Sequence, residues 1–133
     1  VAAEENPGAQ EPSSTEVADV AYQSHSTASI ISLSSACREG SEMAGHDLKT
    51  LTNLLLLGLT DVTLRKEKGL EVQGTPALET TVRGKLNREP MMIQTVVLRR
   101  ETCVYDLVYM ARPQFFDRHA QDFSHFVASL KLK

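Results

Sequence analysis

Residues 74–132 read GTPALETTVRGKLNREPMMIQTVVLRRETCVYDLVYMARPQFFDRHAQDFSHFVASLKL, and this stretch decides the fold. Three runs in it show the alternation and the apolar content of strands: Pro76–Leu86, Met91–Arg100 and Thr102–Ala111. They lead directly into one amphipathic helix, Gln114–Leu130. Strands followed by a terminal helix predict an α+β domain in which that helix covers an antiparallel sheet.

The periodicity of these runs predicts which elements are central. Met91–Arg100 is apolar at alternate positions on both sides, so we expect it to be buried on both faces. Pro76–Leu86 alternates apolar with charged residues, which predicts one wet face. In the helix, apolar side chains recur at spacings of three and four and should face the sheet: Phe116, Ala120, Phe123, Val127 and Leu130.

The upstream half predicts a hairpin and a second helix. Val17–Gln23 and Ala28–Cys37 are strand candidates joined by a short polar loop. Asp47 is placed to be the N-cap of a shorter central helix, Leu48–Leu59. The leucines of that helix form a broad stripe, which predicts that one side is heavily buried: Leu48, Leu51, Leu54, Leu55, Leu57 and Leu59.

Two further segments complete the predicted organisation. Val62–Lys68 and Leu70–Gln73 are expected to be short strands separated by a turn at Gly69. Residues 1–16 contain almost no large apolar side chain, so we expect a disordered or linker tail. A single domain would then span residues 17–133.

Composition excludes several classes of function. The chain has 133 residues, a formal net charge of −3 and 5% aromatic residues without tryptophan, which argues against a nucleic-acid partner. No run reaches the ~18 apolar residues of a transmembrane helix. The chain starts at Val1 rather than Met, so we expect a trimmed product, and a lipid anchor on the unprocessed chain stays open.

The two cysteines, Cys37 and Cys103, allow one disulfide if the protein works in an oxidising compartment. Both lie in predicted strands, and the sequence does not show whether they meet. The alternative is a pair of buried free thiols, which are common in protein cores.

The sequence offers no catalytic, cofactor or metal site. Ser34, Ser35, His25 and Asp106 lack the Gly-x-Ser-x-Gly elbow of a hydrolase. His119 and His125 are six residues apart, so they point to different sides of the terminal helix and are expected to be solvated or at the rim of the core.

Basic and aromatic side chains provide the remaining candidates. Five basic residues are expected around one hairpin turn as a partner surface, unless they are only a solvated strand end: Arg83, Lys85, Arg88, Arg99 and Arg100. Tyr105 and Tyr109 share one face of their strand. They would either line a cleft between sheet and helix or, more commonly, belong to the core.

Three motifs carry a resemblance to a known family: the turn GTPA at 74–77, the strand YDLVYMA at 105–111 and the helix DFSHFVASL at 122–130. Residues 17–132 resemble the PsbP-like fold of photosystem II extrinsic proteins and a Ran-binding nuclear import factor. They are most similar to small bacterial envelope proteins, many of them lipoproteins of unknown function. The chain departs from this pattern because it has no tryptophan and no strand before Val17. No binding residue of the family stands in a matching motif here.

These observations favour a non-enzymatic binding or accessory domain that acts through a protein partner in the periplasm or cell envelope. A cytoplasmic location is the alternative. A second hypothesis is a small-ligand-binding protein or minor enzyme that uses a cleft between the sheet and the long helix. A third is an assembly subunit that pairs through an edge formed by Arg83–Arg100.

Overall fold

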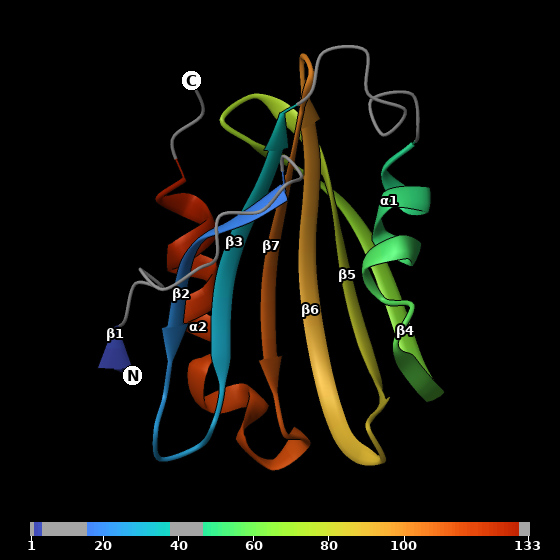
Figure 1. Ribbon diagram of the computed structural model, residues 1–133, viewed down its shortest axis with the longest axis vertical. Helices are drawn as coiled ribbons and strands as arrows, with labels where there is room; N and C mark the ends of the chain where they lie inside the picture. Colours follow the sequence, from blue (N-terminus) through green and yellow to red (C-terminus); the bar gives the residue numbers. More distant parts are fainter. Residues whose placement is uncertain (1, 4–15, 38–46, 131–133) are drawn as a thin grey trace.

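The structure, a computed structural model, describes residues 2–3, 16–37 and 47–130, with the backbone alone at 2–3 and 16–19. The chain forms a seven-stranded antiparallel sheet in the order β1-β2-β3-β7-β6-β5-β4 (Figure 1). The strands are β1 (Ala2–Ala3), β2 (Glu16–Gln23), β3 (Ile30–Cys37), β4 (Leu59–Val72), β5 (Thr75–Leu86), β6 (Glu89–Arg100) and β7 (Cys103–Ala111). The helices are α1 (Leu48–Leu55), the 3-10 turn η2 (Pro113–Phe115) and α2 (Phe116–Ala128). The predicted α+β class, antiparallel sheet and long C-terminal helix are therefore confirmed.

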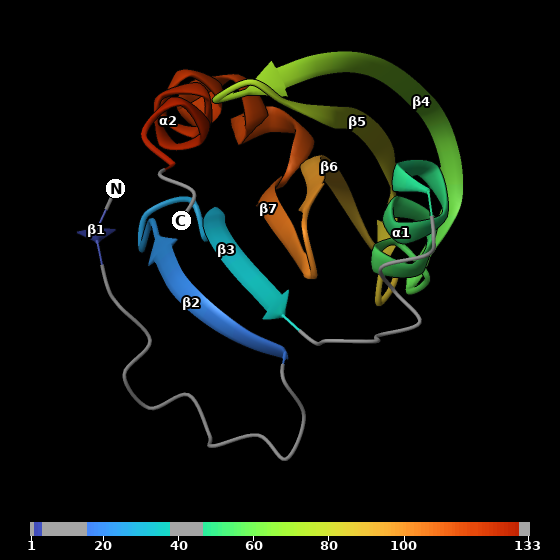
Figure 2. The ribbon, with the colours of Figure 1, turned by 90° about the horizontal axis from the view of Figure 1, so that it is seen from above.

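The two helices lie on opposite faces of the sheet (Figure 2). Two consecutive residues of β6 show this, because Leu98 belongs to the buried cluster under α2 and Val97 to the cluster under α1. Both side chains have an exposed fraction of 0%. The prediction that this strand is central and buried on both faces is confirmed.

Helix α2 covers the larger core. Phe116 and Phe123 are buried against Tyr109 of β7, and their rings stack on the tyrosine ring at centroid distances of 4.7 and 5.7 Å. Ile31 of β3 and Val72 of β4 join the same cluster, so one core runs beneath α2 almost from edge to edge of the sheet. The expectation that the terminal helix covers the sheet is confirmed.

Helix α1 covers much less of its face. Asp47 caps it as predicted, since its Oδ1 accepts a hydrogen bond of 2.7 Å from the Thr50 backbone N–H. Of its leucines, Leu51 is buried at 3% exposure, whereas Leu54 and Leu55 are exposed at 44% and 37%. The prediction of a heavily buried leucine stripe is wrong, because the helix ends at Leu55 and only Leu51 and Thr52 of its residues are buried.

The chain after α1 also differs from expectation. Strand β4 runs without a turn through Gly69, which pairs with Leu78, so the two predicted short strands are one. The pairing of β4 with β5 shifts register between Thr60 and Leu64. Beside this irregularity, a Cβ on Gly84 would lie 2.7 Å from the Thr60 carbonyl oxygen, so β4 can approach only a glycine here.

Tight turns set the registers of the remaining strands. Asn87 and Arg88 both have positive φ angles, 53° and 71°, which is the conformation of a two-residue turn that suits a twisted hairpin. The β2–β3 hairpin docks on β7, where Ile31 is opposite Tyr109 and Cys37 is opposite Cys103. The sequence predicts a tail over residues 1–16 with no strand before Val17, but Ala2–Ala3 pairs with β2, and β2 begins at Glu16. Residues 1 and 4–15 lie outside the described ranges, so disorder there stays a prediction.

Candidate binding surfaces

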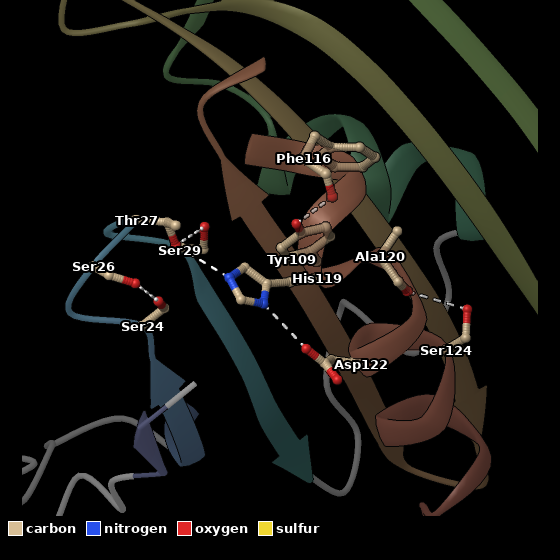
Figure 3. A network of polar contacts seen from close by, with 10 residues as sticks. All are labelled: Ser24, Ser26, Thr27, Ser29, Tyr109, Phe116, His119, Ala120, Asp122 and Ser124. Carbon is tan, nitrogen blue, oxygen red and sulfur yellow. Dashed lines mark hydrogen bonds and ion pairs between the residues drawn. The ribbon is translucent and has the colours of Figure 1, made fainter. Parts of the chain in front are cut away.

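A chain of polar side chains joins the β2–β3 turn to α2 (Figure 3). His119 of α2 lies between Asp122, whose Oδ2 is 3.1 Å from its Nδ1, and Thr27, whose Oγ1 is 3.2 Å from its Nε2. Thr27 Oγ1 is in turn 2.8 Å from Ser29 Oγ. One consistent arrangement has Nδ1–H donating to the carboxylate while Nε2 accepts from the Thr27 hydroxyl. We call these four residues the polar clamp.

The polar clamp has the hydroxyl–imidazole–carboxylate order of a hydrolase relay, but its hydroxyls are enclosed. Thr27 and Ser29 are exposed by only 2% and 3%, and His119 by 7%. A nucleophile must reach the substrate carbon, and an enclosed hydroxyl that already bonds two neighbours cannot. The geometry supports a structural role, in which the clamp satisfies buried polar groups and fixes α2 to the hairpin. The expectation of a solvated His119 is wrong, whereas His125 is exposed.

Beneath α2 the space between helix and sheet is filled. Tyr109 is fully buried and donates a hydrogen bond of 2.5 Å from its hydroxyl to the Phe116 carbonyl oxygen. Burial raises the pKa of Tyr109 to about 12, with smaller contributions from the carboxylates of Asp117 and Asp122. Tyr109 is thus a core residue, and Tyr105 is half-buried against the same core.

A shallow groove of about 390 Å³ lies along the flank of α2 that faces β2 and β3. We call it the α2 groove, and its lining residues are Tyr22, Ile31, Asp122, His125, Phe126 and Ser129. The rings of Tyr22 and Phe126 meet edge to face, with centroids 5.8 Å apart and planes inclined by 80°. The groove is therefore an apolar, aromatic surface with one carboxylate on its rim.

On the opposite face, apolar side chains are exposed around the end of α1. Leu57 is 76% exposed, and Leu54 and Leu55, close to it in the chain, are 44% and 37% exposed. We call these three residues the leucine surface. Polar groups flank it, because Arg65 of β4 donates a hydrogen bond of 2.7 Å to the Asn53 amide oxygen of α1. Arg65 also forms an ion pair of 2.9 Å with Glu67.

The structure does not place the five basic residues around one turn. Arg83, Lys85 and Arg88 lie toward the β5–β6 turn, whereas Arg99 and Arg100 end β6 at its far end. Ten or so strand residues separate the two groups, a distance of roughly 30 Å. Strands β5 and β6 are also both internal, so the hypothesis that this region pairs through a free sheet edge is wrong.

The cysteines lie opposite each other at the ends of β3 and β7. A disulfide joins Cys37 to Cys103 across the two strands, with the Cα atoms 4.0 Å apart. The bond lies at the end of the sheet, where Cys37 is exposed. It covalently links the β2–β3 hairpin to the rest of the sheet.

The residues of the hypothetical hydrolase set are not brought together. Ser34 is paired with Asp106 across β3 and β7, but His25 lies in the exposed β2–β3 turn beyond the other end of β3. Within residues 2–3, 16–37 and 47–130, no three His, Cys, Asp or Glu side chains gather as a metal site. The fourth histidine, His46, which precedes the N-cap residue Asp47, lies outside these ranges.

Comparisons with known proteins place the chain by its fold. No protein-family model and no curated protein matches it. Among solved structures, PA94 of Pseudomonas aeruginosa, a protein of unknown function, is 16% identical with a TM-score of 0.66. The match covers 84% of this chain and 78% of PA94. Cyanobacterial PsbP of Synechocystis is 9% identical with a TM-score of 0.59, covering 93% of this chain and 78% of that one. The chain therefore has the PsbP-like fold that its sequence resembles, and identities this low show the fold alone.

Proposed function

We propose that this chain is a non-enzymatic binding or accessory domain and that it contacts a protein partner through the leucine surface. The observation that carries the proposal is the 76% exposure of Leu57, just after the two exposed leucines at the end of α1. Contiguous exposed apolar side chains on a folded domain mark interaction sites more often than isolated ones do. An apolar centre with polar neighbours such as Arg65 and Asn53 is the usual build of a protein interface.

The incomplete burial of the apolar side of α1 supports this role. The four leucines of LKTLTNLL fall within an arc of about 120° around the helix axis, and the helix carries a single charge, Lys49. Leu51 belongs to the core beneath α1 together with Val97 and Val104. Leu54 and Leu55 belong to the same apolar side but remain 44% and 37% exposed, so a bound partner could cover them.

Site-specific cross-linking in native cells tests the proposal. A photo-reactive amino acid at Asn53, beside the leucine surface, should cross-link one protein partner, and Leu57→Glu should abolish that product. The control is Gln121→Glu, at an exposed position of α2 on the other face of the sheet. It adds the same charge and should leave the cross-linked product unchanged. A product that survives Leu57→Glu, or an Asn53 probe that yields none, contradicts the proposal.

We propose that the protein works in the periplasm or cell envelope, with a cytoplasmic location as the alternative. The disulfide between Cys37 and Cys103 supports an oxidising compartment. In the part of the chain described, neither helix has the length and hydropathy needed to span a membrane. Alkylation of denatured protein taken directly from cells decides the point. Thiols that react only after reduction support export, and thiols that react at once contradict it.

The alternative of a small-ligand-binding protein has one observation against it and one in its favour. The space under α2 is filled by Phe116, Phe123 and Tyr109, which leaves no deep cleft there among the described residues. The α2 groove on the flank, at about 390 Å³, is the place where a ligand would bind.

A further inference from the structure

The α2 groove has a different chemical character from the leucine surface and lies across the sheet from it. Ile31, exposed by 5%, forms part of its floor, and Tyr22 and Phe126 supply its rings. The two rings are inclined by 80°, so they form two walls of a corner rather than one flat stack. Faces of aromatic rings attract cations through the ring quadrupole, and two inclined rings can act on one cation together.

Asp122 adds a fixed negative charge to this corner. Its side chain lines the groove and is 53% exposed, while its Oδ2 is 3.1 Å from His119 Nδ1. His119 is itself buried and bonded to Thr27, so the polar clamp holds the carboxylate in place (Figure 3). A group whose position is fixed before binding loses less entropy when the ligand arrives.

The other lining residues do not oppose a cation with a fixed positive charge. Ser129 directs its hydroxyl to the Phe126 carbonyl oxygen at 2.7 Å, and His125 adds a further ring. Among the residues that line the groove in the described part of the chain, there is no lysine or arginine. The groove thus combines an apolar floor, inclined aromatic walls and a carboxylate.

We propose that the α2 groove binds an alkylammonium group. The apolar floor and the rings contact the alkyl substituents, and Asp122 balances the charge. The volume of about 390 Å³ falls in the range of small-ligand sites and suits a choline-sized cation or the end of a lysine side chain. The proposal is independent of the leucine surface, so either can fail without the other.

Titrations of the full 15N-labelled chain, followed by amide chemical shifts, test the proposal. Choline should give saturable shifts at Tyr22, Ile31, Asp122 and Phe126, and its uncharged carbon isostere, 3,3-dimethylbutan-1-ol, should bind about fivefold more weakly or worse. Nα-acetyl-lysine methylamide identifies the source of the cation. Tighter binding than choline points to a lysine of a protein partner, and weaker binding points to a free amine.

Asp122→Asn keeps a hydrogen-bond acceptor for His119 but removes the charge, and it should weaken choline binding about fivefold to tenfold. Asp117→Asn on the same helix, outside the groove, is the matched control and should change nothing. Equal affinity for choline and its carbon isostere, unchanged binding to Asp122→Asn, or the absence of saturable shifts in the groove each overturns the proposal.

Discussion

Under α2, the described residues form a buried cluster of eleven side chains, whereas the cluster under α1 has three. The α2 side is rich in stacked rings, and its buried tyrosine hydroxyl has a partner. The α1 side leaves leucines exposed, and two hydroxyls on that face of the sheet, of Thr80 and Thr95, have no partner among the described residues. The comparison shows that one face of the sheet holds most of the buried core, while the other leaves apolar side chains exposed.

The largest expected effect comes from breaking the α2 side. Phe123 is 1% exposed and stacks on Tyr109, so Phe123→Ala should lower the free energy of unfolding by about 3–5 kcal/mol. Leu57→Ala on the other side should change it by less than about 0.5 kcal/mol. Urea unfolding followed by circular dichroism measures both. Comparable losses from the two substitutions would mean that α1 carries as much of the core as α2.

A smaller effect follows from the buried hydroxyl of Tyr109, whose pKa is raised to about 12 from an ordinary 10.0. Since the unfolded chain loses this proton first, stability is fully present below pH 10 and falls as the pH rises from 10 through 12, by about 3 kcal/mol. Tyr109→Phe has no hydroxyl to titrate, so its free energy of unfolding should not show this fall at high pH. Wild type should therefore be the more stable protein at pH 8, with a gap that narrows above pH 10. A constant gap would contradict the burial of the hydroxyl.

The smallest effect concerns the opposite face. Thr80 and Thr95 are directly paired between β5 and β6, and both are exposed by 0%. Replacing an unpartnered buried hydroxyl by a methyl group of similar shape removes a desolvation cost, so Thr95→Val should stabilise the domain by about 1 kcal/mol. Thr81→Val, half-buried on the other face of β5, is the control and should give no gain. Destabilisation by Thr95→Val would show that this hydroxyl has a partner.

Local pattern was sufficient for much of the fold. Alternation placed β5, β6 and β7 within one or two residues, and the spacing of Phe116, Phe123 and Leu130 located the face of α2. Capping chemistry placed the start of α1 at Asp47. These features depend on near neighbours in the chain, and short-range periodicity therefore records them.

The candidate sites were predictable to a smaller degree. Thr27 and His119 are 92 residues apart, and nothing near either residue in the sequence indicates their contact. A leucine-rich helix predicts burial by its periodicity, but the exposure of Leu57 depends on where α1 ends and β4 begins. The corner formed by Tyr22 and Phe126 likewise requires the β2–β3 hairpin to dock beside β7. Such contacts are set by tertiary packing, which one sequence does not display.

The pairing of β3 with β7 has a consequence for how the molecule is made. Residues 30–37 find their partner strand only at residues 103–110, after every other strand has been synthesised. Contacts between distant parts of a chain form slowly, because a long loop must close before they contribute. During synthesis from the N-terminus, the β2–β3 hairpin therefore has no partner strand along β3 until residues 103–110 have been made. Cys37 likewise cannot form its disulfide before Cys103 has been synthesised, so β3 keeps an exposed strand edge during that time.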